Sequence, residues 1–355
     1  MKPGVISQGI TCPIIRKGDD LKNIVVNSVL SVTKTPYGYY DINNKSVLGI
    51  TESIVARAQG NYATVDEIAD WIVNYINSKP NKYTTINILH PIYSRNRFAI
   101  ILRGIARAAN RLNLGIVIEM PIKDEVGNDC INHPFTKMDY DEYYISICKE
   151  EKCTNVIVCD VMAYADEGDF VIDCALHGDY SELKTITLAD ILSERCEFGL
   201  LGCNKVDEET VKLFPNKKLA QQLVEEINRE LKHRTDKDVV VCVYGDGCFK
   251  DPVGGIWEFA DPVSMPAYTH KEIIESTPNE LKVKALADDK YKYLNGVDLN
   301  KAIEAEIKNK KDLIGKMDSQ GTTPRLYRDL LASLMDLTSG SGDRCTPIIL
   351  IKNYL

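Results

Sequence analysis

The sequence lacks the local motifs that mark several common enzyme classes. It contains no HExxH pair, no GxSxG elbow, no GxGxxG following a strand, and no glycine-rich loop closed by GKS or GKT. Zinc peptidases, triad hydrolases, Rossmann dinucleotide enzymes and Walker A nucleotide sites are therefore not indicated. Histidine is scarce, with five in 355 residues, and the eleven cysteines include no CxxC pair, which argues against a zinc ribbon.

Excess positive charge, long apolar runs and a leader pattern are lacking as well. The net charge is -8 and the sequence pI is about 5.3, whereas non-specific nucleic-acid binding requires a basic surface. No apolar run approaches the roughly 20 residues of a membrane-spanning helix, and the N-terminus has no basic-then-apolar signal pattern. Cys159 and Cys242 lie inside apolar strand patterns and are expected to be free buried thiols, as in a reducing compartment. We therefore expect a cytoplasmic protein whose partners are neither nucleic acids nor membranes.

What the sequence does contain is an alternation of buried-strand and amphipathic-helix patterns, which predicts an α/β (mixed α+β) fold. A chain of 355 residues exceeds the usual size of one domain, so two lobes are expected. The patterns predict strands at 46–50, 85–89, 115–120, 155–160, 239–243 and 347–351, and helices at 24–32, 64–76, 98–112, 217–232 and 323–337. Residues 51–59 are expected to form a turn or helix, and the polar residues 123–144 a long loop.

Local signals refine the predicted helices. Asp19 or Asp20 can cap the first helix, Thr64 and Glu67 form a capping box, and Thr323 can cap the last helix. In the helix at 217–232 the expected apolar face consists of Leu219, Leu223, Ile227 and Leu231.

The loop after the strand at 239–243 is the first candidate for chemistry. Gly245 and Gly247 flank Asp246, so the backbone can turn tightly and present a carboxylate at the end of a strand. Mg²⁺ bound to a nucleotide takes one or two such protein carboxylates, and Asp251 and Asp261 are close enough in the sequence to assist. The alternative is a tight turn in which Asp246 makes only a local hydrogen bond.

Two further segments could hold anions. Residues 338–344 place two glycines and two serines between a helix and a strand, which can form a backbone nest for phosphates with Arg344 as counter-charge. A glycine helix cap followed by a linker explains the same pattern. Arg95 and Arg97, between a strand and a helix, suit a substrate carboxylate or phosphate, although a solvated pair of surface arginines is an equal alternative.

Four blocks, taken in order, resemble the coenzyme F420-0 γ-glutamyl ligase family. Residues 13–21 are similar to its PLI-x-x-GDDL opening, and residues 47–60 to a strand that ends in S/T-x-x-I-S-K-A-E-G. Residues 239–255 resemble its DTNGR-x-F-R block, and residues 337–351 its glycine-rich loop before a final strand. The resemblance implies that residues 1–82 and 197–355 form a γ-glutamyl ligase-like domain and that residues 83–196 are an inserted α/β subdomain.

The resemblance also implies a reaction and a site. In that family GTP phosphorylates a carboxylate, the amine of L-glutamate displaces the phosphate, and divalent metal ions hold the phosphates. Here it implies Mg²⁺ or Mn²⁺ with GTP or ATP, L-glutamate, a small carboxylic-acid acceptor and a homodimer. Metal would be bound by Asp246 and Asp251, and Asp246 and Arg57 would be catalytic. The implied nucleotide contacts are Cys12, Pro13, Ile14, Ile15, Glu52, Ser53, Arg57, Asn204, Ser339, Gly340, Ser341, Gly342 and Asp343.

Departures from the family pattern leave three hypotheses. The family's N-A-G-I-D-x-S-N segment corresponds to residues 199–205, where Asn204 is retained and the metal-binding Asp is absent. Arg57 stands in place of a lysine, and the two are not equivalent at a phosphate. The hypotheses are a metal- and nucleotide-dependent γ-glutamyl ligase, a non-catalytic ligand-binding member of the family, and a phosphoryl-transfer enzyme outside ligase chemistry.

Overall fold

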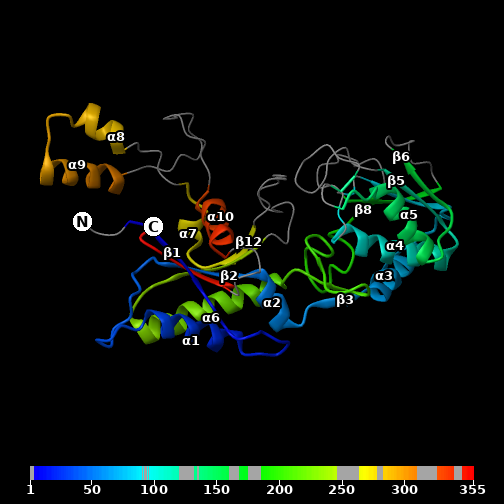
Figure 1. Ribbon diagram of the computed structural model, residues 1–355, viewed down its shortest axis with the longest axis horizontal. Coiled ribbons are helices and arrows are strands. Elements are labelled where there is room, and N and C mark those ends of the chain that lie inside the picture. Colours follow the sequence, from blue (N-terminus) through cyan, green and yellow to red (C-terminus); the bar gives the residue numbers. More distant parts are fainter. Residues whose placement is uncertain are drawn as a thin grey trace.

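The computed structural model describes residues 4–89, 91, 94, 96–119, 132–133, 136–159, 168–174, 185–245, 264–277, 283–309, 326–339 and 346–355. These residues form a mixed α/β structure with two five-stranded sheets and one three-stranded sheet (Figure 1). The α/β prediction is therefore confirmed. In the described ranges no helix is long and apolar enough to cross a membrane.

The first five-stranded sheet is mixed, with the order β1-β13-β2-β11-β12. Only β2 and β11 pair in parallel, and the other neighbours are antiparallel. The pairing of β1 with β13 sets the two ends of the described chain side by side (Figure 1). The strands are β1 (Ile6–Ile10), β2 (Val47–Thr51), β11 (Val240–Gly245), β12 (Ser264–Tyr268) and β13 (Ile348–Lys352).

Helices cover both faces of this sheet, and the strand β11 shows why. Its side chains alternate, so that Val241 and Val243 belong to the core under one face while Val240, Cys242 and Tyr244 belong to the core under the other. A strand buried on both faces reads as a continuous apolar run. The first core is closed by α1 (Leu21–Thr33) and α6 (Lys217–Thr235), and the second by α10 (Tyr327–Ser339) and the short α7 (Lys271–Ile274), as Figure 1 shows.

The second five-stranded sheet is entirely parallel, with the order β6-β5-β4-β7-β8. It packs with three helices around a separate core that also takes in Leu200, Val211 and Leu213. This core therefore extends beyond residues 83–196 at both ends, and the predicted division into domains stays a prediction. The elements are α3 (Val65–Asn77), β4 (Thr85–Leu89), α4 (Phe98–Leu112), β5 (Gly115–Glu119), α5 (Tyr140–Glu150), β6 (Val156–Cys159), β7 (Asp169–Asp173) and β8 (Thr185–Thr187).

The small sheet β3-β10-β9 connects the two larger units. Its strand β3 (Tyr62–Thr64) lies between α2 (Glu52–Gln59) and α3 in Figure 1. The hairpin of β9 (Asn204–Lys205) and β10 (Thr210–Lys212) completes it. Arg107 of α4 anchors this hairpin through ion pairs to Glu209 and also pairs with Glu151, the C-cap of α5.

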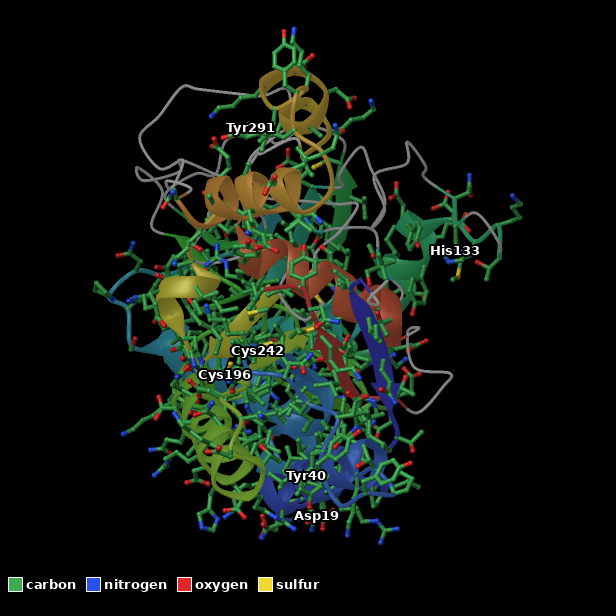
Figure 2. All side chains as sticks on the ribbon, turned by 90° about the vertical axis from the view of Figure 1, so that its left-hand side faces the viewer. Asp19, Tyr40, His133, Cys196, Cys242 and Tyr291 are labelled. Carbon is green, nitrogen blue, oxygen red and sulfur yellow. The ribbon has the colours of Figure 1, made fainter. Side chains whose placement is uncertain are left out.

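The helical segment 283–309 has no buried residue and comprises α8 (Val283–Ala285), a π-helix (Leu286–Lys290) and α9 (Gly296–Lys308). Tyr291 lies on this segment, well apart from Cys242 in the interior (Figure 2).

Most predicted elements are confirmed, including Asp20 as cap of α1 and the capping box of Thr64 and Glu67. The expected loop at 123–144 is wrong at its end, because Asp139 caps α5, which begins at Tyr140. Leu219 is 50% exposed, and the buried face of α6 consists of Ala220, Val224, Ile227 and Leu231. Strands β7 and β8 were not predicted. The last helix begins at Tyr327, and Thr323 lies outside the described residues.

The prediction of free thiols is confirmed for the cysteines that the structure describes, whereas the predicted burial is confirmed for Cys242 and not for Cys159. All eight of these cysteines are free. Cys242 is fully buried, whereas Cys159 is only partly buried.

Candidate functional site

The carboxyl ends of the central strands meet at one edge of the mixed sheet. Thr51 pairs with Tyr244, and its N–H donates to the Pro347 carbonyl over 2.9 Å. Gly245 pairs with Ser264. The described residues on either side of 246–263 therefore lie at this edge, beside the strand that leads into α2.

Both described flanks of the predicted phosphate loop at 338–344 lie at the same edge. Ser339 ends α10, and the Thr346 hydroxyl donates a hydrogen bond to the Ser339 carbonyl over 3.0 Å just before β13 begins. Burial raises the pKa of Tyr244 at the end of β11, while the side chain of Ser339 acts to lower it. Ser339 is thus close to Tyr244, and segments more than 90 positions apart in the sequence meet here.

A buried ion pair lies at this edge. Glu52 is the first residue of α2, and its carboxylate accepts hydrogen bonds from Lys212 Nζ at 3.1 Å and 3.4 Å. Glu52 is 3% exposed and Lys212 is 6% exposed. Charged side chains are almost never this buried unless they are paired. The pair thus joins the mixed sheet to the β9–β10 hairpin.

Gly245 is required by this packing rather than by its backbone angles. A Cβ atom at Gly245 would overlap Cγ of Glu52 and would lie 3.0 Å from its Cβ. Glycine therefore allows β11 to end directly against the buried carboxylate.

The outward face of α2 carries the other predicted residues. Ser53 and Arg57 are four residues apart and share that face, and Arg57 is exposed. Within the described part of the chain, the side chain of Arg57 makes no hydrogen bond or ion pair. Its guanidinium is therefore available to an anion.

The first predicted block packs against the far end of α2. The Gly18 N–H donates to the Ala58 carbonyl over 2.9 Å, which holds residues 12–18 beside the helix. Ile15 is buried in the core, whereas Ile14 is 82% exposed. Cys12 and Pro13 connect this loop to β1, and Cys12 packs partly against the same core. A nucleotide contact of Ile15 is therefore expected through its backbone.

The structure joins two residues that were predicted for different ligands. Arg97 Nε donates to Asn204 Oδ1 over 3.3 Å, and Asn204 pairs with Lys212 across the β9–β10 hairpin. Burial raises the pKa of the neighbouring Cys203 thiol to about 12, although the positive charges of Arg97 and Lys212 act to lower it. Both cations thus lie close to Cys203.

Lys212 was missed by sequence reasoning. The available signal was a single lysine within the otherwise apolar run at 211–214. A charge in a buried strand needs a partner, but the pattern does not say which one.

Comparison with known protein families decides the relationship. The family model of F420-0:gamma-glutamyl ligase matches residues 9–353. The chain belongs to this family. No curated protein matches the sequence.

The match spans the segments that bear Cys12, Glu52, Arg57 and Asn204, as well as residues 83–196. The family supports a ligase-type function.

Several predicted site residues of this ligase-family member lie outside the described residues: Arg95, Asp246, Asp251, Gly340, Ser341, Gly342 and Asp343. Among the described residues, no group of three His, Cys, Asp or Glu side chains could hold a metal ion. Glu52 has its carboxylate paired with Lys212. The described side chains thus do not form a divalent-metal site by themselves, and binding through Asp246 and Asp251 stays a prediction.

Proposed function

We propose that this chain is a nucleotide-dependent ligase of the γ-glutamyl ligase type, which joins the amine of L-glutamate to the activated carboxyl group of a small carboxylic acid. The observation that carries the proposal is the convergence, at one edge of the mixed sheet, of the flanks of all four family blocks. The side chain of Arg57, exposed and without a partner among the described residues, lies in the last turn of α2, the helix that begins at that edge.

The chemistry requires charge neutralisation and positioning. A carboxylate oxygen of the acceptor attacks the γ-phosphorus of GTP or ATP, and the nucleoside diphosphate leaves, so that an acyl phosphate forms. The amine of L-glutamate then attacks the acyl carbon, inorganic phosphate leaves with the bonding electron pair, and the amine loses a proton. Stabilising the transferring phosphoryl group is most of what such catalysis demands.

In this proposal the guanidinium of Arg57 contacts the nucleotide phosphates. Arginine presents N–H donors in a planar fork that matches phosphate oxygens. Dependence on Mg²⁺ or Mn²⁺ belongs to the proposal through the family, and we assign no step to the metal.

The test combines binding with product formation. Calorimetry with GTP and with ATP, each with MgCl₂ or MnCl₂, measures nucleotide affinity, and mass spectrometry detects an amide in the presence of glutamate and candidate acids. We expect Arg57→Ala to weaken nucleotide binding by roughly tenfold, because a charge-assisted hydrogen bond is lost. Arg229→Ala, an exposed arginine of α6, is the matched control. Absence of nucleotide binding with both metals would refute the proposal.

One observation favours a second candidate, a binding protein without catalytic turnover. Glu52, a buried carboxylate at this edge, is paired with a lysine of the same chain. This candidate predicts nucleotide binding with no amide product. If Asp246→Ala abolished a measured ligase activity, the binding-only candidate would be excluded.

The homodimer that the family resemblance implies stays part of the proposal. Light scattering coupled to size-exclusion chromatography measures the mass in solution against the 39.8 kDa of one chain.

A further inference from the structure

Lys212 faces the edge of the mixed sheet because of its place in the β9–β10 hairpin. Val211 and Leu213, on either side of it, belong to the core beneath the parallel sheet. Since successive side chains of a strand point to opposite faces, Lys212 points away from that core and reaches Glu52 of α2. The alternation of β10 thus brings a buried cation to the edge at which β2 and β11 end.

The ammonium group of Lys212 has one donor more than its acceptors use. An ammonium carries three N–H donors. Those of Lys212 meet the two carboxylate oxygens of Glu52 at 3.1 Å and 3.4 Å, and no other described residue accepts from this ammonium. Buried donors in proteins are nearly always paired. The remaining N–H of Lys212 therefore calls for an acceptor that the described part of the chain does not supply.

Glu52 holds this ammonium in a fixed position. The end of β11 packs so closely against Glu52 that a Cβ atom at Gly245 would overlap its Cγ. The carboxylate is buried as well, so the pair is in place before any ligand binds. Lys212 also offsets the negative charge of Glu52, which would otherwise repel an anion at this edge.

The adjoining start of α2 offers further N–H donors. Its N-cap residue, Thr51, makes no side-chain capping hydrogen bond. The first N–H groups of a helix have no acceptor within the helix, and together with the helix dipole they favour a bound anion. The ammonium of Lys212 contacts the first residue of this helix, so two independent groups of donors meet at one place.

We propose that Lys212 binds a phosphate group of the nucleotide at the start of α2, and that Glu52 is the residue that positions its ammonium. A phosphate oxygen accepts the remaining N–H of Lys212, whose compact charge suits phosphate. This inference rests on the proposed function for the identification of the phosphate as part of a nucleotide. Lys212 lies outside the four blocks that resemble the family.

The test compares two variants that break the same ion pair from opposite sides. Calorimetry measures the binding of GTP, ATP and tripolyphosphate, each with MgCl₂, to the full chain. Lys212→Met removes the phosphate contact and leaves the charge of Glu52 unopposed, so these ligands should bind at least about tenfold more weakly. Glu52→Gln keeps the ammonium and removes the opposing charge, so they should bind at least as tightly as they do to the wild type.

These opposite effects separate phosphate binding from a purely structural ion pair, whose loss from either side would weaken binding alike. Lys212→Arg retains the positive charge and should bind the ligands more tightly than Lys212→Met does. Lys205→Met removes a lysine of the same hairpin that pairs with the exposed Glu208, and this matched control should bind as the wild type does.

Circular dichroism establishes that each variant is folded. If Lys212→Met does not fold, the comparison of Glu52→Gln with the wild type still decides, because weaker binding by Glu52→Gln would overturn the inference. Wild-type affinity in Lys212→Met would overturn it as well.

The phosphate-only ligand keeps the two proposals distinguishable. Tripolyphosphate binding with the two opposite effects, in a chain that binds neither GTP nor ATP, supports the phosphate site and refutes the ligase. Nucleotide binding that Lys212→Met leaves unchanged supports the ligase and overturns the role of Lys212. If the wild type binds none of the three ligands, both proposals are refuted.

Discussion

Replacing Lys212 by methionine removes the cation of the buried ion pair and retains an unbranched side chain of similar length. At the observed 3.1 Å, Coulomb's law with an effective dielectric constant of about 20 gives an attraction of about 5 kcal/mol. The desolvation of the two ions opposes this attraction by several kcal/mol for each ion, so the net contribution of the intact pair is small. Removing one partner is different, because the other charge stays buried without compensation.

We therefore expect Lys212→Met and Glu52→Leu to lower the free energy of unfolding by about 3–5 kcal/mol each. The double variant replaces the pair by apolar side chains and should be more stable than either single variant. The midpoint of urea unfolding, followed by circular dichroism, measures this double-mutant cycle.

The control is Lys205→Met, which removes an ion pair to the exposed Glu208 in the same hairpin. An exposed pair contributes about 1 kcal/mol or less, so this variant should be nearly neutral. The reasoning would be refuted if the single variants were as stable as the wild type. It would also be refuted if the loss of unfolding free energy in the double variant equalled the sum of the losses in the two single variants.

Three further predictions follow from the described residues. Gly245→Ala should destabilise the protein by about 1–3 kcal/mol, because the new methyl group overlaps Glu52. The control is Gly4→Ala, whose methyl group meets no atom within 4 Å, and urea unfolding compares the stability of the two variants. Burial opposes ionisation of Glu151, but hydrogen bonds from Arg107 and Arg103 outweigh it and hold its pKa below the ordinary 4.5. The stability that this depressed pKa contributes is present above pH 4.5 and is lost as the pH falls through the pKa of the folded state. Below pH 4.5 the melting temperature of Glu151→Gln should therefore change less with pH than that of the wild type. Equal slopes of melting temperature against pH in the two proteins would contradict this. Burial raises the pKa of both Cys148 and Cys196 to about 12. N-ethylmaleimide should therefore leave these two thiols unmodified in the native protein and modify them in urea, whereas the partly exposed Cys12 should be modified under both conditions. Mass spectrometry locates the adducts.

Local features were read correctly from the sequence because their causes are local. The capping box of Thr64 and Glu67 spans three residues, and the apolar run of β11 records burial on both faces. The same short-range rules failed at Leu219, because a helix pattern with two possible apolar stripes does not reveal which one faces the sheet.

The family membership was also present in the sequence, as four blocks in order, and the family match over residues 9–353 confirms it. The blocks did not indicate that Arg97 and Asn204 contact each other, although each was named for an anion or a nucleotide. That contact depends on how the hairpin packs against α4, across 107 positions of the chain.

Taken alone, the amino-acid sequence determined the periodicity, the caps and the family of this protein, because each depends on neighbouring residues or on the order of motifs. The order of strands in the two large sheets was decided by tertiary structure, which set Gly245 against Glu52 and brought Lys212 to Glu52 from 160 positions away. A buried charge requires a partner, but burial and strand order, rather than sequence distance, select which residue that partner is.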